Sequence, residues 1–347
     1  MEAVEYLLKA AGHVGNLTNS KIEQIQGIMR RSRTLALNAA IESARAGTAG
    51  QGFSVVANEM KTISDEITGL ASSLQGELKE QLEQLNHNAS VATSELRKVR
   101  GERLADLAHN AVEIADRNLF ERTCDVRWWA TDPAVWECAA DPHSKAKQEH
   151  ASHRLGVILG SYTVYLDLWI ADTNGKVISN GRPSRYSNVT GRDVSRTQWF
   201  QEAISTQDGT EFTVADISRE PALDNAMTAT YSTAIRAGGD TNGGVIGVLG
   251  IFFDWSSQAK DIVRGIRLSP EEWERTRCLL IDSKHRIIAS SDGNGILSDH
   301  FPLDVSRGTQ GHYTIDDQVL IGYALTPGYE TYKGLGWYGV ITQWEET

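Results

Sequence analysis

The sequence predicts an α+β protein in which a long antiparallel helical hairpin is followed by two tandem α/β units. Two observations predict this fold. Early in the chain, apolar residues recur at alternating steps of three and four, which is typical of coiled-coil helices. Later, short apolar segments bounded by turn signals follow one another twice in the same order. The expected divisions are a hairpin (1–95), a connecting helix (96–125), a first α/β unit with leading helices (126–258) and a second α/β unit (259–347).

The hairpin is centred on residues 35–59. Residues 46–50 predict a tight turn, because their two glycines can leave the right-handed helix without steric cost. We expect apolar seams on both arms to pack on each other. The surface left over predicts a dimer, in which a second copy completes a four-helix bundle. The seam positions are Val14, Ile25, Ile28, Leu35 and Ala39 on the ascending arm, and Phe53, Val56, Met60, Ile63, Ile67, Leu70 and Leu74 on the descending arm.

The sequences LALNAAIESARAG and GQGFSVVANEM around this turn resemble the hairpin tip of bacterial methyl-accepting chemotaxis proteins. In that family the tip binds a coupling protein and a histidine kinase, so the resemblance implies these partners here. Glu42 and Arg45 lie three apart on one helix face, where they can pair within the chain or across a contact. The alternative is an ordinary surface ion pair. The positions that match the family's interaction residues are Leu37, Asn38, Glu42, Arg45, Phe53, Val55, Val56 and Glu59.

Four residues just before this signature depart from the family pattern, namely Arg30, Arg31, Arg33 and Thr34. Arg30 and Thr34 occupy positions through which dimers of the family associate into trimers, so trimers of dimers remain an open question here. The added cations could instead select a different, acidic partner surface.

The ascending arm has about 46 residues, which corresponds to about 70 Å of helix. Its antiparallel partner should therefore end near Ala92. Receptors of the family carry their methylated glutamates on a longer continuation of both arms, so we expect no adaptation by methylation if Met1 begins the natural chain. Beyond Ala92 the helical pattern persists to about Cys124, and Gly101 is the only glycine there, which predicts a stiff connecting helix.

Composition excludes several classes of protein. The formal net charge of −11, without a domain-wide basic surface, argues against nucleic acid as a partner. The amino terminus lacks the basic start and apolar core of a secretory signal, and the most apolar run, 245–253, is too short to cross a bilayer. These features predict a cytoplasmic protein without a membrane span. The three cysteines are scattered, which suits reduced thiols.

The remainder of the chain predicts the two α/β units. Residues 127–149 predict an irregular segment. The elements expected in the first unit are a helix at 150–161, a strand hairpin at 165–179 with its turn at 172–175, a helix at 195–205, and strands at 211–217, 226–235 and 245–253. Those expected in the second are a strand hairpin at 279–290 and strands at 311–315, 318–327 and 337–343.

Four motifs in this region together resemble a double Cache sensor domain, a PAS-like ligand-binding module. They are LWIADTNGKVISNG, GRDVSRTQWFQEA, GGVIGVLGIFFDW and LIGYALTPGYETYKGLGWYGVITQ, and the resemblance covers roughly residues 105–347. In that family small molecules bind in the first unit. The positions that correspond to ligand contacts are Arg196, Trp199, Phe200, Asp216, Tyr231 and Asp254.

These residue types suit a small ligand. Aromatic faces can form the walls, Arg196 can hold a carboxylate with a bidentate fork, and Asp216 or Asp254 can accept an ammonium group. Two residues separate Arg196 from Trp199, where the amine-recognising version of the domain has one, so an amino-acid ligand is not implied. An organic acid held by Arg196 is preferred. The alternative is that the aromatic residues are core and that Asp254 caps a strand end.

Potential metal ligands gather in one segment, namely Cys138, His143, His150 and His153. They would suit a metal or redox sensor, but their spacing matches no standard zinc pattern and polar loop residues are the default. The sequence contains no phosphate-binding glycine loop, nucleophile elbow or metal-hydrolase pair. We therefore expect neither an enzyme nor a cofactor.

Together these observations predict a cytoplasmic chemoreceptor-like transducer. A ligand in the first Cache unit would change the packing of helices near residues 104–119, and the tip would report this change to its partners. The rival hypothesis is a ligand-binding dimer in which the hairpin serves only for oligomerisation, which the departures at residues 30–34 favour. The ligand's identity and the sign of the output stay open.

Overall fold

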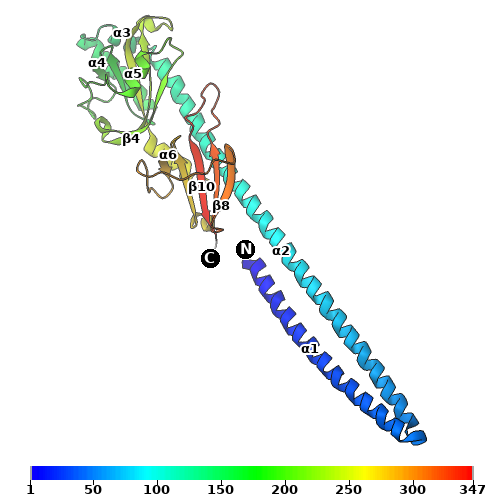
Figure 1. Ribbon diagram of the computed structural model, residues 1–347. Helices are drawn as coiled ribbons and strands as arrows, with labels where there is room; N and C mark the ends of the chain where they lie inside the picture. The colour runs from blue at the N-terminus through cyan, green and yellow to red at the C-terminus, as the bar shows by residue number, and fades with distance from the viewer. Residues whose placement is uncertain (1, 346–347) are drawn as a thin grey trace. The chain divides into compact units, whose positions relative to one another are not determined.

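The computed structural model describes residues 2–345 (Figure 1). The chain divides into two compact parts, of which the first ends at Val99 and the second begins at Arg100. The first part is a helical hairpin formed by α1 (Glu2–Arg45), a short 3-10 helix (Gly47–Gly50) and the beginning of α2 (Gln51–Trp129). Within residues 2–345, no helix is long and apolar enough to cross a membrane. Met1, on which the expectation about methylation depends, lies outside the described residues.

The predicted turn at 46–50 is confirmed, and its glycines are structurally required. Gly47 adopts a left-handed φ of +60°, which side chains other than hydrogen disfavour. A Cβ atom on Gly50 would lie 2.1 Å from the carbonyl oxygen of Ser43, so any larger residue would push the two arms apart. The turn can therefore bring α2 back along α1 only with glycine at position 50.

The two arms of the hairpin meet mostly through small residues, with Ile22 as a large exception, which corrects the expectation that the apolar seams pack on each other. The Ser64 hydroxyl on α2 donates to the Ser32 hydroxyl on α1 at 3.1 Å. Small side chains allow two helices to approach closely, and the larger residues then point away from the contact. The best-buried positions are spaced by multiples of seven on each arm: Ile22, Ala36 and Ser43 on α1, and Ala57, Ser64 and Ala71 on α2.

Most residues of the predicted seams therefore remain exposed. Phe53 is 74% exposed and Leu70 is 71% exposed, whereas Ile67 is partly buried. Each arm of the hairpin therefore carries a stripe of exposed apolar side chains, which is typical of a surface that binds a partner. The other exposed seam residues are Val14, Ile25, Ile28, Leu35, Ala39, Val56, Met60, Ile63 and Leu74.

Helix α2 continues past Cys124 to Trp129, and helix α3 (Pro133–Ala140) follows where the sequence predicts an irregular segment. The helix predicted at 150–161 is confirmed as α4 (Lys145–Ser161), which begins five residues earlier than expected. Their starts carry standard signals, because the Asp132 carboxylate accepts the Ala134 N–H at 3.0 Å and Ser144 caps α4. The aromatic and proline content of this segment predicted irregular structure, although the capping residues Asp132 and Ser144 indicate helix starts.

The first α/β unit contains an antiparallel sheet with the strand order β2-β1-β5-β4-β3. Helix α5 (Gln198–Ile204) packs on one face of this sheet, against β4 and β5. The predicted strands are all present, with ends shifted by a few residues. Their bounds are β1 (Tyr165–Asp172), β2 (Val177–Asn180), β3 (Thr213–Glu220), β4 (Ala226–Arg236) and β5 (Val245–Asp254).

The second unit repeats this topology, with the order β7-β6-β10-β9-β8. Two helices that the sequence did not predict precede it, α6 (Trp255–Arg264) and α7 (Pro270–Trp273). The two sheets match strand for strand, which confirms the tandem repeat and the α+β fold class. The strands are β6 (Thr276–Ile281), β7 (Ile287–Ser290), β8 (Gln310–Ile315), β9 (Val319–Leu325) and β10 (Tyr338–Trp344).

Helix α2 lies directly on the second sheet. A Cβ atom on Gly322 of β9 would come within 2.5 Å of the backbone nitrogen of Ala105, and one on Gly339 of β10 within 2.5 Å of the Ala108 carbonyl oxygen. Leu104 and Ala108 are buried in this contact. Glycine at these two strand positions therefore lets the helix backbone touch the sheet.

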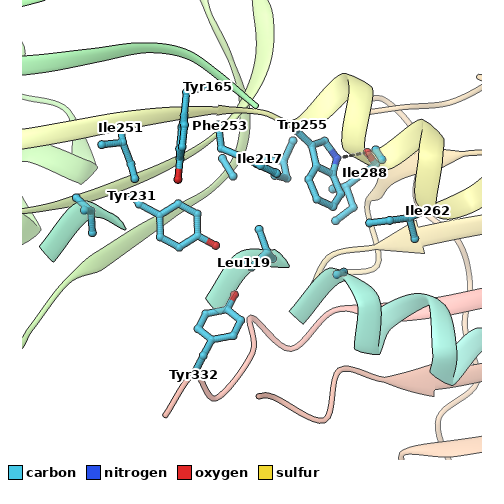
Figure 2. Packing of buried hydrophobic residues seen from close by; sticks show 14 of the residues in the cluster. Leu119, Tyr165, Ile217, Tyr231, Ile251, Phe253, Trp255, Ile262, Ile288 and Tyr332 are labelled. Carbon is cyan, nitrogen blue, oxygen red and sulfur yellow. Dashed lines mark hydrogen bonds between the residues drawn. The ribbon is translucent and has the colours of Figure 1, made fainter. Parts of the chain in front are cut away.

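A single core joins α2 to both sheets. Figure 2 shows Leu119 of α2 beside Tyr231 of β4 and Tyr332, whose hydroxyl groups point toward each other. The Trp255 indole at the start of α6 donates to the Ile288 carbonyl oxygen of β7 at 2.7 Å (Figure 2). Because the core is closely packed, displacement of either sheet would be transmitted to α2 through these contacts.

Candidate functional site

A cavity of about 540 Å³ lies where the first sheet faces the turn between β6 and β7. Its walls come from the beginning of α5, from β3 and β4, and from residues 282–286, with His300 beside them. This volume is within the range of small-molecule sites in proteins. Both apolar and ionisable side chains line it, so it can hold a small polar molecule.

Trp199 forms the aromatic wall of the cavity. The side chain is only 5% exposed and packs edge-on against Phe252 and Trp169. Its position depends on Gly250 of β5, because a Cβ there would lie 2.9 Å from the Trp199 ring. The buried indole nitrogen of Trp199 makes no hydrogen bond within residues 2–345. It is therefore a donor without an acceptor beside a cavity.

Asp216 supplies the acidic side of the cavity. Its Oδ1 accepts the Ile217 N–H at 2.7 Å, and the side chain is 45% exposed. Desolvation raises the pKa of Asp216, while the Ile217 hydrogen bond and the nearby Arg286 oppose that shift. A ligand group that donates a hydrogen bond or carries positive charge would relieve the desolvation.

The basic side comes from the turn between β6 and β7. Asp282, which is 1% exposed, accepts the backbone N–H groups of Lys284 and Arg286 at 2.9 Å and the Arg286 Nε at 2.8 Å. The Arg286 Nη2 also donates to the Ile217 carbonyl oxygen at 2.9 Å. This turn is therefore rigid and already bonded to the first sheet, and it directs two cations toward the cavity.

The structure brings only two of the six predicted ligand residues to this cavity, Trp199 and Asp216. Arg196 is exposed and is not among the lining residues. Phe200 is buried in the core beside Trp199. Successive residues of a strand face opposite sides, so Thr230 lines the cavity whereas Tyr231 lies in the core with α2.

Asp254 also lies away from the cavity lining. Its carboxylate accepts the Ser256 N–H at 3.2 Å and caps α6. The alternative hypothesis was that Asp254 caps a strand end. Asp254 is indeed a capping residue, but it caps a helix. Sequence reasoning missed Lys284 and Arg286, since DSKHR was interpreted only as a turn, and it did not single out His300. The sequence did contain a signal for Lys284 and Arg286, because DSKHR has more cationic residues than DTNGK, the corresponding turn of the first repeat.

The hairpin tip forms a second candidate site. All eight residues that match the chemoreceptor positions are exposed. Glu42 and Arg45 form an ion pair at 2.7 Å, as their spacing predicts, with both side chains largely in solvent. Around them Phe53, Val55 and Val56 are 64% to 74% exposed, so the tip presents a charged pair beside an apolar surface.

The cysteine and histidines named above as potential metal ligands are not brought together. Cys138 is fully buried and burial raises the pKa of its thiol to about 11, whereas His143, His150 and His153 are not arranged around it. No group of three or more histidine, cysteine or acidic side chains within residues 2–345 is placed to hold a metal ion.

Comparison with known proteins supports the two resemblances. Residues 3–118 match the family described as "Methyl-accepting chemotaxis protein (MCP) signalling domain". The chain is 35% identical over 124 residues to methyl-accepting chemotaxis protein McpA of Pseudomonas putida, a match covering 33% of this chain and 19% of that protein. It is 39% identical over 101 residues to McpN of Pseudomonas aeruginosa, covering 27% of this chain and 18% of that protein. The matched segment thus spans less than a fifth of either relative.

Solved structures share the fold of the α/β region. The sensory domain of the Campylobacter jejuni chemoreceptor Tlp3 covers 72% of this chain and 96% of its own, with a TM-score of 0.53 at 18% identity. The sensor domain of the V. cholerae histidine kinase DctB covers 76% of this chain and all of its own, with a TM-score of 0.50 at 10% identity. At these identities the likeness shows the fold alone, which is of the Cache type.

Proposed function

We propose that this protein is a chemoreceptor-like signal transducer that binds a small molecule in its Cache-like region and signals through the hairpin tip to a coupling protein and a histidine kinase. The observation that carries the proposal is the tip. Every matching position is exposed there, on a hairpin that matches the chemoreceptor signalling domain. Large apolar side chains as exposed as Phe53 and Val55 are typical of a surface that binds a partner.

The packing of α2 supports a route from the sensor to the hairpin. Leu104, Ala108 and Leu119 of α2 are buried against the α/β units. The same helix continues as the descending arm of the hairpin. A ligand that favours one packing of the sheets on α2 would therefore bias the helix, provided that it binds the two packings with different affinity.

A pull-down with the coupling protein tests the proposal. Wild type should retain the coupling protein, whereas Glu42→Ala and Phe53→Ala should each weaken binding, because they remove an exposed charge or an apolar anchor from the tip. Glu83→Ala is the matched control. Glu83 is 70% exposed and paired along its helix, as Glu42 is 68% exposed and paired. Absence of binding by wild type would refute signalling through the coupling protein.

A second candidate function is a ligand-binding dimer that keeps the hairpin only for oligomerisation. The exposed seams of both arms favour it, because they could be covered by a second copy alone. Arg30, Arg31 and Arg33 depart from the family and favour it further. This function predicts a dimer in light scattering that does not retain the coupling protein.

Three further features belong to the proposal. We expect a homodimer, since four helices bury the seams that two leave exposed. We expect the hairpin to act in the cytoplasm, where the family's coupling protein and kinase are found. We also expect signalling without catalysis by this chain, since its chemoreceptor relatives are signal transducers.

A further inference from the structure

We propose that the second α/β unit supplies the anion-binding side of the ligand cavity through Lys284 and Arg286, so that a small carboxylate which also carries a hydrogen-bond donor bridges the two units. This inference rests on the proposed function, in which the cavity is the sensor. It replaces Arg196 as the group that holds the carboxylate, and it makes the ligand a link between the two sheets.

The turn that carries these cations is a counterpart of the turn between β1 and β2. In the first repeat the Asp172 carboxylate accepts the N–H groups of Asn174 and Lys176, and in the second Asp282 accepts those of Lys284 and Arg286. The same backbone thus occurs twice. The second copy lines a cavity and places a lysine where the first has Asn174.

The Arg286 guanidinium is held in place but is not saturated. Its Nε and Nη2 donate to Asp282 and to the Ile217 carbonyl oxygen, while Nη1 makes no hydrogen bond within residues 2–345. Arginine has five donors in a fixed plane, so an anchored guanidinium with a spare edge can readily donate to a carboxylate. Because the bond to Ile217 already joins β3 to this turn, a ligand at Arg286 lies on an existing bridge.

Lys284 is the cation with its charge still available. Its side chain lines the cavity and forms no ion pair within the described part of the chain. Three acidic groups at the cavity already have an arginine partner, because Asp282 pairs with Arg286 at 2.8 Å, Asp216 lies 4.0 Å from Arg286, and Glu220 lies 3.7 Å from Arg192. Lys284 and Asp216 line the same cavity, which has room for a ligand that carries both an anion and a donor.

The remaining walls suit the same class of ligand. Asp216 is a partly exposed acceptor whose pKa desolvation raises, and a hydroxyl or ammonium group of the ligand could donate to it. A dicarboxylate without a donor would instead bring like charge to Asp216.

Binding at this place has a mechanical consequence. The turn joins β6 to β7, and β6 pairs directly with β10, which carries Gly339 against Ala108 of α2. A ligand that holds this turn against β3 therefore acts on the sheet that contacts the signalling helix.

The test is a thermal-shift assay of the full chain with four probes: lactate and γ-aminobutyrate, which combine a carboxylate with a donor, succinate, which has no donor, and ethanolamine, which has no carboxylate. Ligands that bind the folded state raise the melting temperature. We expect lactate or γ-aminobutyrate to raise it in wild type, with little effect of succinate or ethanolamine.

Variants then locate the anion contact. Lys284→Ala should weaken binding roughly tenfold or more, since a charge-assisted contact is lost, and Lys284→Arg should restore most of it. Arg196→Ala and Lys176→Ala, in the corresponding turn of the first repeat, should bind as wild type does. Equal binding by Lys284→Ala, or loss of binding in Arg196→Ala, would overturn the inference.

The failures of the two proposals are distinguishable. A shift with ethanolamine and with neither carboxylate would keep a ligand-binding sensor but overturn the anion contact at Lys284. No shift with any of the four probes would also overturn the proposed ligand class, while the coupling-protein pull-down would still decide whether the tip signals.

Discussion

Asp116 of α2 should make the α/β part of the protein less stable at neutral than at mildly acidic pH. The side chain is 0% exposed, its Oδ2 accepts the Gly328 N–H at 2.7 Å, and its Oδ1 has no hydrogen bond within residues 2–345. Burial raises the pKa of Asp116 from the usual 3.8 to about 6, because one backbone hydrogen bond does not replace the water lost by the charged carboxylate.

The magnitude follows from this raised pKa. The folded state holds the proton more tightly than the unfolded chain does, so the protonated carboxyl stabilises the fold. That contribution is fully present below about pH 4 and is lost as pH rises through about 6. A pKa that is higher by one in the folded state than in the unfolded chain is equivalent to about 1.4 kcal/mol. The free energy of unfolding should therefore fall by up to about 3 kcal/mol in total, on account of Asp116, as pH rises from below about 4 to well above 6.

Asp116→Asn isolates this contribution, since asparagine stays neutral and keeps an oxygen for the Gly328 N–H. The variant should match wild type near pH 4 and exceed it at about pH 7 by up to about 3 kcal/mol. Urea unfolding followed by tryptophan fluorescence measures this difference in the α/β part, because all nine tryptophans lie between Trp128 and Trp344.

The comparison between variant and wild type cancels other carboxyls whose pKa burial raises, such as Asp125 and Asp167. Asp106→Asn is the control, because Asp106 lies on the same helix but is exposed. An Asp116→Asn protein that is no more stable than wild type at neutral pH, or that shows the same pH dependence, would refute the reasoning.

Three other predictions concern packing and reactivity. Gly322→Ala should destabilise the α/β part by about 1 to 3 kcal/mol in urea unfolding, because its Cβ would meet α2 at 2.5 Å, whereas Gly244→Ala, with nothing within 4 Å, should have little effect. Gly50→Ala should lower the thermal stability of the hairpin in far-UV circular dichroism and weaken coupling-protein binding, and unchanged values would contradict the role assigned to the turn. A maleimide should label only Cys124 in the native protein, since burial raises the pKa of the other two thiols to about 11 and about 12; rapid labelling of a second thiol would contradict their burial.

In the hairpin, sequence periodicity and glycines predict the helices and the turn but not the face that is buried. Alternating steps of three and four predict two helices and a seam, and the glycines at 47 and 50 predict the turn, because these are local properties. Which face meets the other arm is not local. Ala57 and Ser64 form the contact because small residues let the helices come close, and Phe53 and Leu70 are left outside.

In the ligand cavity, too, some lining residues could be predicted from the sequence and others could not. Trp199 and Asp216 could be predicted from the motifs that resemble a Cache domain. Tyr231 could not be separated from Thr230 without the strand's orientation, since adjacent residues face opposite sides of a sheet. Lys284 lies far from Trp199 in the sequence, and only the packing of the second unit against β3 brings both to one cavity.

The sequence by itself determined the order of most helices and strands, the tandem repeat, the chemoreceptor-like tip and the class of sensor, because periodicity, turn residues and motifs are written in neighbouring positions. The tertiary structure alone decided which side chains are buried, which cations face the cavity and where α2 touches a sheet. The physical reason is that burial and desolvation depend on contacts between distant segments, and these contacts exist only after the sheets pack on the helix.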